Sequence, residues 1–183
     1  MNIRLIFFLV VIFSGALKAQ HDHAKKETTS DTTKKSIPKE THVQIGEVHM
    51  MIHYHSPAVR GRVIWGGLVP YGEVWVTGAH SATTWEFNKD ISIDGKVIPH
   101  GKYAVFTIPD KDSWIFILNK KWDQHLTDEY DGKDDVLRLK VPTILTADVQ
   151  ERLKYFINQK SDTEGRLSIS WEKVKIEIPF QLK

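Results

Sequence analysis

Apolar and polar side chains alternate with a period of two in many short segments between Met50 and Phe180. In residues 49–55, for example, Met50, Ile52 and Tyr54 fall on one face and the histidines fall on the other. This alternation is typical of half-buried β-strands, whereas an amphipathic helix repeats its apolar positions every three or four residues. No convincing long helix pattern interrupts the segments. The sequence therefore predicts an all-β fold: a single antiparallel β-sandwich of jelly-roll or immunoglobulin-like form, or a flattened barrel.

Two segments in the middle of the chain, 102–108 and 113–119, are apolar on both faces. We expect them at the centre of a sheet that is covered on both sides. Asp94-Gly95 lies between two short β-like segments and predicts a type I′ hairpin turn.

The later segments are less regular. Residues 146–158 fit either a helix or a strand, and the strands predicted around them favour a strand. Residues 167–171 and 174–180 alternate in the same way, and we expect them to pair as a closing hairpin.

Residues 1–19 have the pattern of a secretory signal peptide. Arg4 supplies the positive charge, Leu5 to Phe13 is an apolar run, and Ala19 is a small residue at the cleavage point. The run is shorter than the roughly 20 residues that cross a bilayer. Because the sequence contains no cysteine, it offers neither a lipobox cysteine nor a disulfide. We predict an exported, soluble protein, periplasmic or extracellular, that is not a lipoprotein and has no transmembrane segment after cleavage.

Residues 20–42 contain one aliphatic side chain larger than alanine, Ile37. Such a polar segment buries too little apolar surface to offset the entropy of ordering, so we predict a disordered tether there and the sandwich domain at 43–183.

The chain has 25 Lys+Arg and 23 Asp+Glu, and removal of Arg4 and Lys18 with the leader leaves a net charge of 23 − 23 = 0. This balance excludes the basic surface that nucleic-acid binding requires.

Residues 56–87 form a long Gly/Trp-rich loop. Glycines and prolines recur too often there for a long regular element, yet three tryptophans lie among them: Trp65, Trp75 and Trp85. We therefore predict a packed loop that either closes the core of the sandwich or lines a site.

The motifs of this loop are also those of a known family. Val59 to Trp75, Thr77-Gly78-Ala79 and the later Phe106-Thr107-Ile108-Pro109 resemble the domain-of-unknown-function family 2911, and the resemblance extends over residues 43–180. It implies an exported bacterial protein, chiefly of Gram-negative envelopes, with no established activity. Members of that family usually have the sequence Arg-Thr-Gly-Ala-Asn-Glu-Ala-Thr after the tryptophan. Here Val76, His80 and Ser81 replace the arginine, the asparagine and the glutamate.

Histidines are the candidate metal ligands. His53 and His55 lie on one face of a strand, about 6.5–7 Å apart, a spacing that two ligands of zinc or copper use. His80 is the natural third ligand, and His125 is a further candidate. An enzyme built on this cluster would use Glu73 or Asp128 as a base. The alternative is that His53 and His55 form the solvated face of an edge strand.

Tryptophans suggest a third possibility, a carbohydrate-binding module. Trp85, Trp114 and Trp171 are in phase with apolar core positions, whereas Trp65, Trp75 and Trp122 lie in or near loops. Exposed indole rings stack on sugar rings, although large aromatic side chains more commonly supply core area.

The sequence lacks the common catalytic motifs Gly-x-Ser-x-Gly and His-Glu-x-x-His. We therefore expect a non-catalytic binding or accessory domain, with a metal-dependent protein and a carbohydrate-binding module as alternatives. The ligand, a small molecule or an envelope component, is expected where the Gly/Trp-rich loop meets the His53/His55 face.

Overall fold

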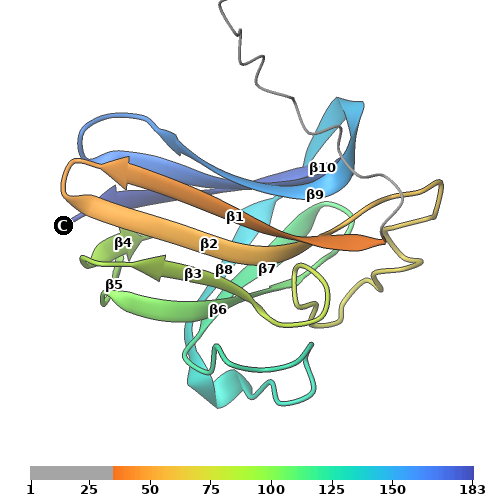
Figure 1. The fold of residues 1–183 in the computed structure, drawn as a ribbon, viewed down its shortest axis with the longest axis horizontal. Coiled ribbons are helices and arrows are strands. Elements are labelled where there is room, and N and C mark those ends of the chain that lie inside the picture. Colours follow the sequence, from red (N-terminus) through yellow and green to blue (C-terminus); the bar gives the residue numbers. More distant parts are fainter. Residues whose placement is uncertain (1–34) are drawn as a thin grey trace, which may run out of the picture. The chain divides into compact units, whose positions relative to one another are not determined.

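The computed structural model describes residues 35–183, which form strands joined by loops, one 3-10 helix (η1, Gly132–Asp134) and no α-helix. Figure 1 shows the course of the chain. The strands are β1 Ser36–Ile45, β2 Val48–Pro57, β3 Thr83–Phe87, β4 Ile91–Ile93, β5 Lys96–Ile98, β6 Gly101–Ile108, β7 Ser113–Asn119, β8 Asp135–Pro142, β9 Ile144–Gln159 and β10 Glu164–Leu182. No helix in this part of the chain is long and apolar enough to cross a membrane.

The strands form two antiparallel sheets. The larger has the order β1-β2-β3-β6-β7-β8 and the smaller has the order β5-β4-β10-β9. The inward side chains of both sheets belong to one apolar core, with Ile52 and Trp85 from the larger sheet and Ile93 and Ile176 from the smaller all 0% exposed. The predicted all-β sandwich is confirmed, and it consists of two separate open sheets.

The central position predicted for the two strands that are apolar on both faces is also confirmed. β6 and β7 lie inside the larger sheet. Their outer faces contribute Ala104, Phe106 and Ile117 to a second apolar cluster, which Val76 and Ala82 of the Gly/Trp-rich loop complete. This part of the loop therefore packs on the outer face of the larger sheet.

The Asp94-Gly95 turn joins β4 to β5 as the sequence predicts. Asp94 has a φ of 50° and Gly95 a φ of 76°. Positive φ at both central residues is the requirement of a type I′ turn.

The ambiguous segment 146–158 is a strand, as predicted, and forms most of β9. β9 pairs with β10 in the register Leu167↔Ile157. Figure 1 shows these two long strands, in blue, side by side.

The closing hairpin predicted from residues 167–171 and 174–180 is wrong, because both segments belong to the single strand β10. Trp171 and Val174 are both buried although they are three positions apart in the sequence. In a regular strand they would face opposite sides. At Glu172 the pairing register with β9 shifts and φ is 54°, and this irregularity interrupts the alternation so that the apolar side chains return to the core.

The predicted boundary between tether and domain is also corrected, because Ser36–His42 belongs to β1. These residues pair with β2 from Ser36↔Pro57 onward, and the Thr41 hydroxyl donates to the Tyr155 carbonyl at 3.0 Å. A backbone ladder along a well-packed strand stabilises this polar segment without large apolar side chains. The signal peptide predicted at 1–19 and the tether up to Lys34 lie outside the described residues.

Thr77 joins the Gly/Trp-rich loop to both sheets. Its carbonyl accepts hydrogen bonds from the Tyr155 hydroxyl of β9, at 2.7 Å, and from the Thr83 hydroxyl of β3, at 3.1 Å. Its own hydroxyl lies 2.9 Å from that of Thr107 in β6. Thr77 is fully buried with a φ of 51°, a conformation that β-branched residues rarely adopt, so these bonds must hold it there.

Tyr155→Phe should lower the free energy of unfolding by about 1–2 kcal/mol, because the buried Thr77 carbonyl loses one of its hydroxyl donors while the ring packing is retained. Urea denaturation followed by tryptophan fluorescence measures this change. Tyr71→Phe is the matched control, because Tyr71 is 37% exposed and its hydroxyl makes no hydrogen bond within residues 35–183. Equal unfolding midpoints for the two variants would contradict the assignment.

Candidate functional site

Four tryptophans pack together where the Gly/Trp-rich loop meets the sandwich. The ring centroid of Trp65 is 4.7 Å from that of Trp114 and 5.8 Å from that of Trp171. Trp75 stacks on Trp171 at 5.7 Å with an interplanar angle of 20°. The loop tryptophans Trp65 and Trp75 are thus partly buried extensions of the core, as expected for a packed loop.

The loop leaves an apolar groove beside this cluster, with a volume of about 410 Å³. We call it the tryptophan groove. Its apolar walls are formed by Leu68, Val69, Trp75, Val76, Leu126 and Trp171. A concave surface of this size with mostly apolar walls is typical of small-molecule sites.

The charged residues at the tryptophan groove are all basic. Lys35, Arg62 and His80 line it, and no acidic residue does. Arg62 is held by the backbone carbonyls of Val59, 3.1 Å from its Nε, and Ala58. Neither Lys35 nor Arg62 forms an ion pair with any described residue. The groove therefore suits a negatively charged group attached to an apolar body.

Two of the four predicted metal ligands come together. The rings of His55 and His80 have centroids 5.0 Å apart at an angle of 76°. His80 has a φ of 64°, and its carbonyl accepts a 2.8 Å hydrogen bond from the Leu126 amide, which holds it in position. Burial, and secondly the nearby His80, lower the pKa of His55, which favours the neutral imidazole.

The other two predicted ligands each lie against a separate carboxylate. His53 Nδ1 is 3.3 Å from Glu40 Oε2, and His125 Nδ1 is 3.2 Å from Asp128 Oδ2. Within residues 35–183, no group of three or more His, Asp or Glu side chains is arranged to hold a metal ion. The four-histidine site therefore stays a prediction, in which only His55 and His80 are in mutual contact.

A second hollow, of about 260 Å³, lies on the outer face of the larger sheet, and we call it the sheet-face hollow. His53 and His55 of β2, Thr84 of β3, Lys102 of β6 and the segment Trp122-Asp123-Gln124 line it. Alternation predicts that Thr84 points outward, opposite Trp85, but only strand register places it beside His53. Sequence reasoning did not identify Thr84 or Gln124, because no local motif marks either residue.

The His55–His80 contact joins the two hollows. His55 lines the sheet-face hollow and His80 lines the tryptophan groove. The ligand position expected from the sequence, where the Gly/Trp-rich loop meets the His53/His55 face, therefore corresponds to two neighbouring concave surfaces.

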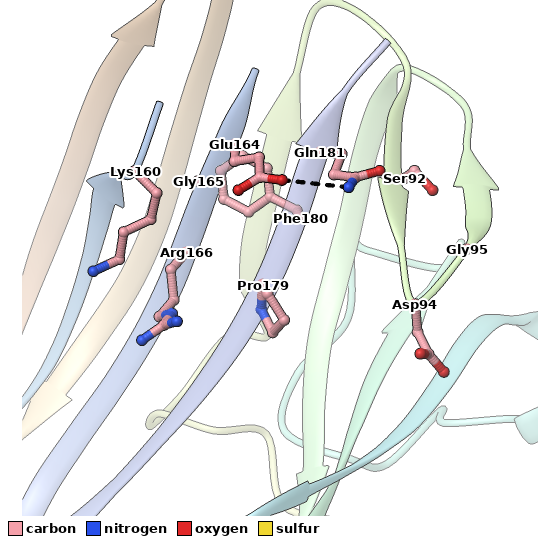
Figure 2. Close-up of a pocket in the computed structure, with 10 residues that line it drawn as sticks. All are labelled: Ser92, Asp94, Gly95, Lys160, Glu164, Gly165, Arg166, Pro179, Phe180 and Gln181. Carbon is pink, nitrogen blue, oxygen red and sulfur yellow. Dashed lines mark hydrogen bonds between the residues drawn. The ribbon is translucent and has the colours of Figure 1, made fainter. Parts of the chain in front are cut away.

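A third hollow, shown in Figure 2, lies at the β4–β5 turn and the start of β10. Two of its charged side chains have partners: Arg166 pairs with Glu177, and Glu164 accepts a 3.5 Å hydrogen bond from Gln181. Figure 2 shows Lys160 and Arg166 on one side and Asp94 on the other. The hollow contains no histidine or tryptophan, and no buried polar side chain lines it without a partner. We do not regard it as a functional site.

Comparison with known proteins identifies one family whose model matches the chain. A family model described as "Protein of unknown function (DUF2911)" matches residues 36–180. No curated protein and no solved structure matches the chain.

Proposed function

Because the chain belongs to the DUF2911 family, whose description assigns no activity, we propose a function from the geometry: a non-catalytic domain that binds a small ligand in the tryptophan groove. The observation that supports this most directly is the groove itself, with aromatic and aliphatic walls and a rim on which Lys35, Arg62 and His80 carry or accept positive charge. Such walls bind an apolar body, and the rim favours a carboxylate, sulfonate or phosphate on it. An aromatic or aliphatic anion is therefore the ligand class that fits.

The fluorescent anion 8-anilinonaphthalene-1-sulfonate is a suitable probe, because it carries both chemical features. We expect the wild-type protein to bind it, with energy transfer from the groove tryptophans and weaker binding as the salt concentration rises. Leu68→Glu places a negative charge in the groove, at a side chain that is 48% exposed, and should raise the Kd at least tenfold, about 1.4 kcal/mol.

Val97→Glu is the matched control. It introduces the same charge at an apolar side chain that is 51% exposed on β5 of the smaller sheet and does not line the groove. The proposal fails if both variants bind the probe as the wild type does, or if the folded wild type does not bind it.

We also propose that the domain is exported. The support is the leader pattern of Arg4, the apolar run Leu5 to Phe13, and Ala19. N-terminal sequencing of the protein from the culture medium or periplasm should begin at Gln20. A protein that starts at Met1 and is recovered with the cytoplasm would rule out export.

Metal binding is a second candidate function, favoured by the 5.0 Å contact of the His55 and His80 rings. The lowered pKa of His55 keeps an imidazole in the neutral form that binds metals. Ligands that share a zinc ion each lie about 2.1 Å from it, and these two rings are close enough to provide two of them. Further ligands would have to come from outside this pair.

For the metal candidate, we expect added zinc to raise the melting temperature of the wild type, because an ion that binds only the folded state stabilises it. His55→Ala and His80→Ala should each abolish this increase. His53→Ala is the control and should retain it, since His53 lies against Glu40. An increase that survives both His55→Ala and His80→Ala, or no increase in the wild type, would eliminate this candidate.

A further inference from the structure

Two buried polar side chains line the sheet-face hollow, and each has an oxygen atom without a hydrogen-bond partner among the described residues. Thr84 and Gln124 are each only 6% exposed. Neither Thr84 Oγ1 nor Gln124 Oε1 has a hydrogen-bond partner among the described residues. Buried polar atoms are nearly always paired, because leaving one unpaired costs free energy. Because both side chains line a hollow, a molecule bound there can supply the missing partner.

The hydrogen bonds that are present define what the missing partner must be. Gln124 Nε2 donates to the Lys121 carbonyl, so the amide is oriented with its oxygen as the free group. That oxygen can only accept, and a ligand must therefore donate to it. A carboxylate or a fully ionised phosphate has no donor, and an apolar group has none either. The Thr84 hydroxyl both donates and accepts, so a ligand hydroxyl satisfies both residues.

Trp122 adds an apolar surface beside these polar atoms. It is 41% exposed, and the Nζ of Lys102 lies 4.2 Å from its ring centroid, so a cation–π contact holds the indole in place at the edge of the hollow. The combination of an exposed indole with hydrogen-bonding groups at its edge suits a molecule with an apolar C–H face and hydroxyl groups around it. A sugar ring has this form.

We propose that the sheet-face hollow is a saccharide-binding site, in which Trp122 stacks on the sugar ring and Gln124 and Thr84 bind its hydroxyl groups. The site is separate from the tryptophan groove proposed above and differs from it in ligand class. The volume of about 260 Å³ lies below the range of about 300–1,000 Å³ that is usual for drug-sized ligands, so a single ring or the end of a chain fits. His53 and His55 provide further donors and acceptors at the rim.

Saturation-transfer NMR with glucose, galactose, mannose and N-acetylglucosamine, followed by calorimetry on the sugar that binds best, tests the proposal. We expect saturable binding of at least one sugar. Trp122→Ala, Gln124→Leu and Thr84→Val should each raise its Kd at least tenfold. The last two variants keep the side-chain volume close to that of the wild type, and melting curves verify that all three are folded.

Two matched controls accompany these variants. Tyr71→Ala removes an exposed aromatic ring that lines neither hollow. Gln44→Leu removes an exposed amide whose Nε2 also donates to a backbone carbonyl, that of Gly46, at 2.9 Å. Both should leave sugar binding unchanged.

A free sugar and the end of a polysaccharide have the same hydroxyl chemistry, so co-sedimentation with peptidoglycan and with cellulose forms a second arm. Binding in either arm that depends on Trp122 and Gln124 supports the site and identifies its source. Absence of binding in both arms, or binding that these variants do not weaken, overturns it. Anilinonaphthalene sulfonate binding, measured on the same variants, reports separately on the tryptophan groove.

Discussion

The hydrogen bonds of the Thr77 carbonyl are the interaction on which the rest of the candidate site depends. Burial raises the pKa of Tyr155 well above its usual value, so its hydroxyl remains a donor to that carbonyl at any physiological pH. The bond joins the loop to β9, and the Thr83 hydroxyl joins it to β3. With Thr77 held in this way, the loop positions Trp75 and Val76 on one side of it and His80 on the other.

The loop holds these residues in fixed positions because it packs against other side chains on both of its sides. On one side the tryptophan cluster occupies the end of the sandwich, and on the other side Val76 and Ala82 cover the outer faces of β6 and β7. Aromatic rings in such edge-to-face contacts pack with well-defined geometry. The groove is therefore lined by a loop that behaves as part of the core, which is the condition for a preformed binding site.

Much of the fold follows from local chemistry, and the errors have a common cause. Alternation predicted the sandwich, the two segments that are apolar on both faces predicted the central position of β6 and β7, and the Asp94-Gly95 pair predicted the turn between β4 and β5. Alternation failed at Glu172, where an irregularity in the strand separates two apparent segments that both belong to β10, because alternation alone does not distinguish such an irregularity from a turn. The low apolar content of Ser36–His42 predicted a tether, and this was wrong because pairing with β2, and not side-chain burial, forms the strand.

The candidate sites were predictable to a smaller extent. The sequence by itself determined which side chains share a face of each strand, and hence that His53 and His55 lie on the same face. It also determined that the Gly/Trp-rich stretch is a packed loop, since glycine and proline prevent a regular element while indole rings favour burial. Only the tertiary structure decided that His55 meets His80, that His53 and His125 lie against carboxylates, and that Gln124 lies beside Thr84. The physical reason is that most of these contacts join residues distant in sequence, and that the geometry of all of them depends on strand register and loop packing, which no local pattern encodes.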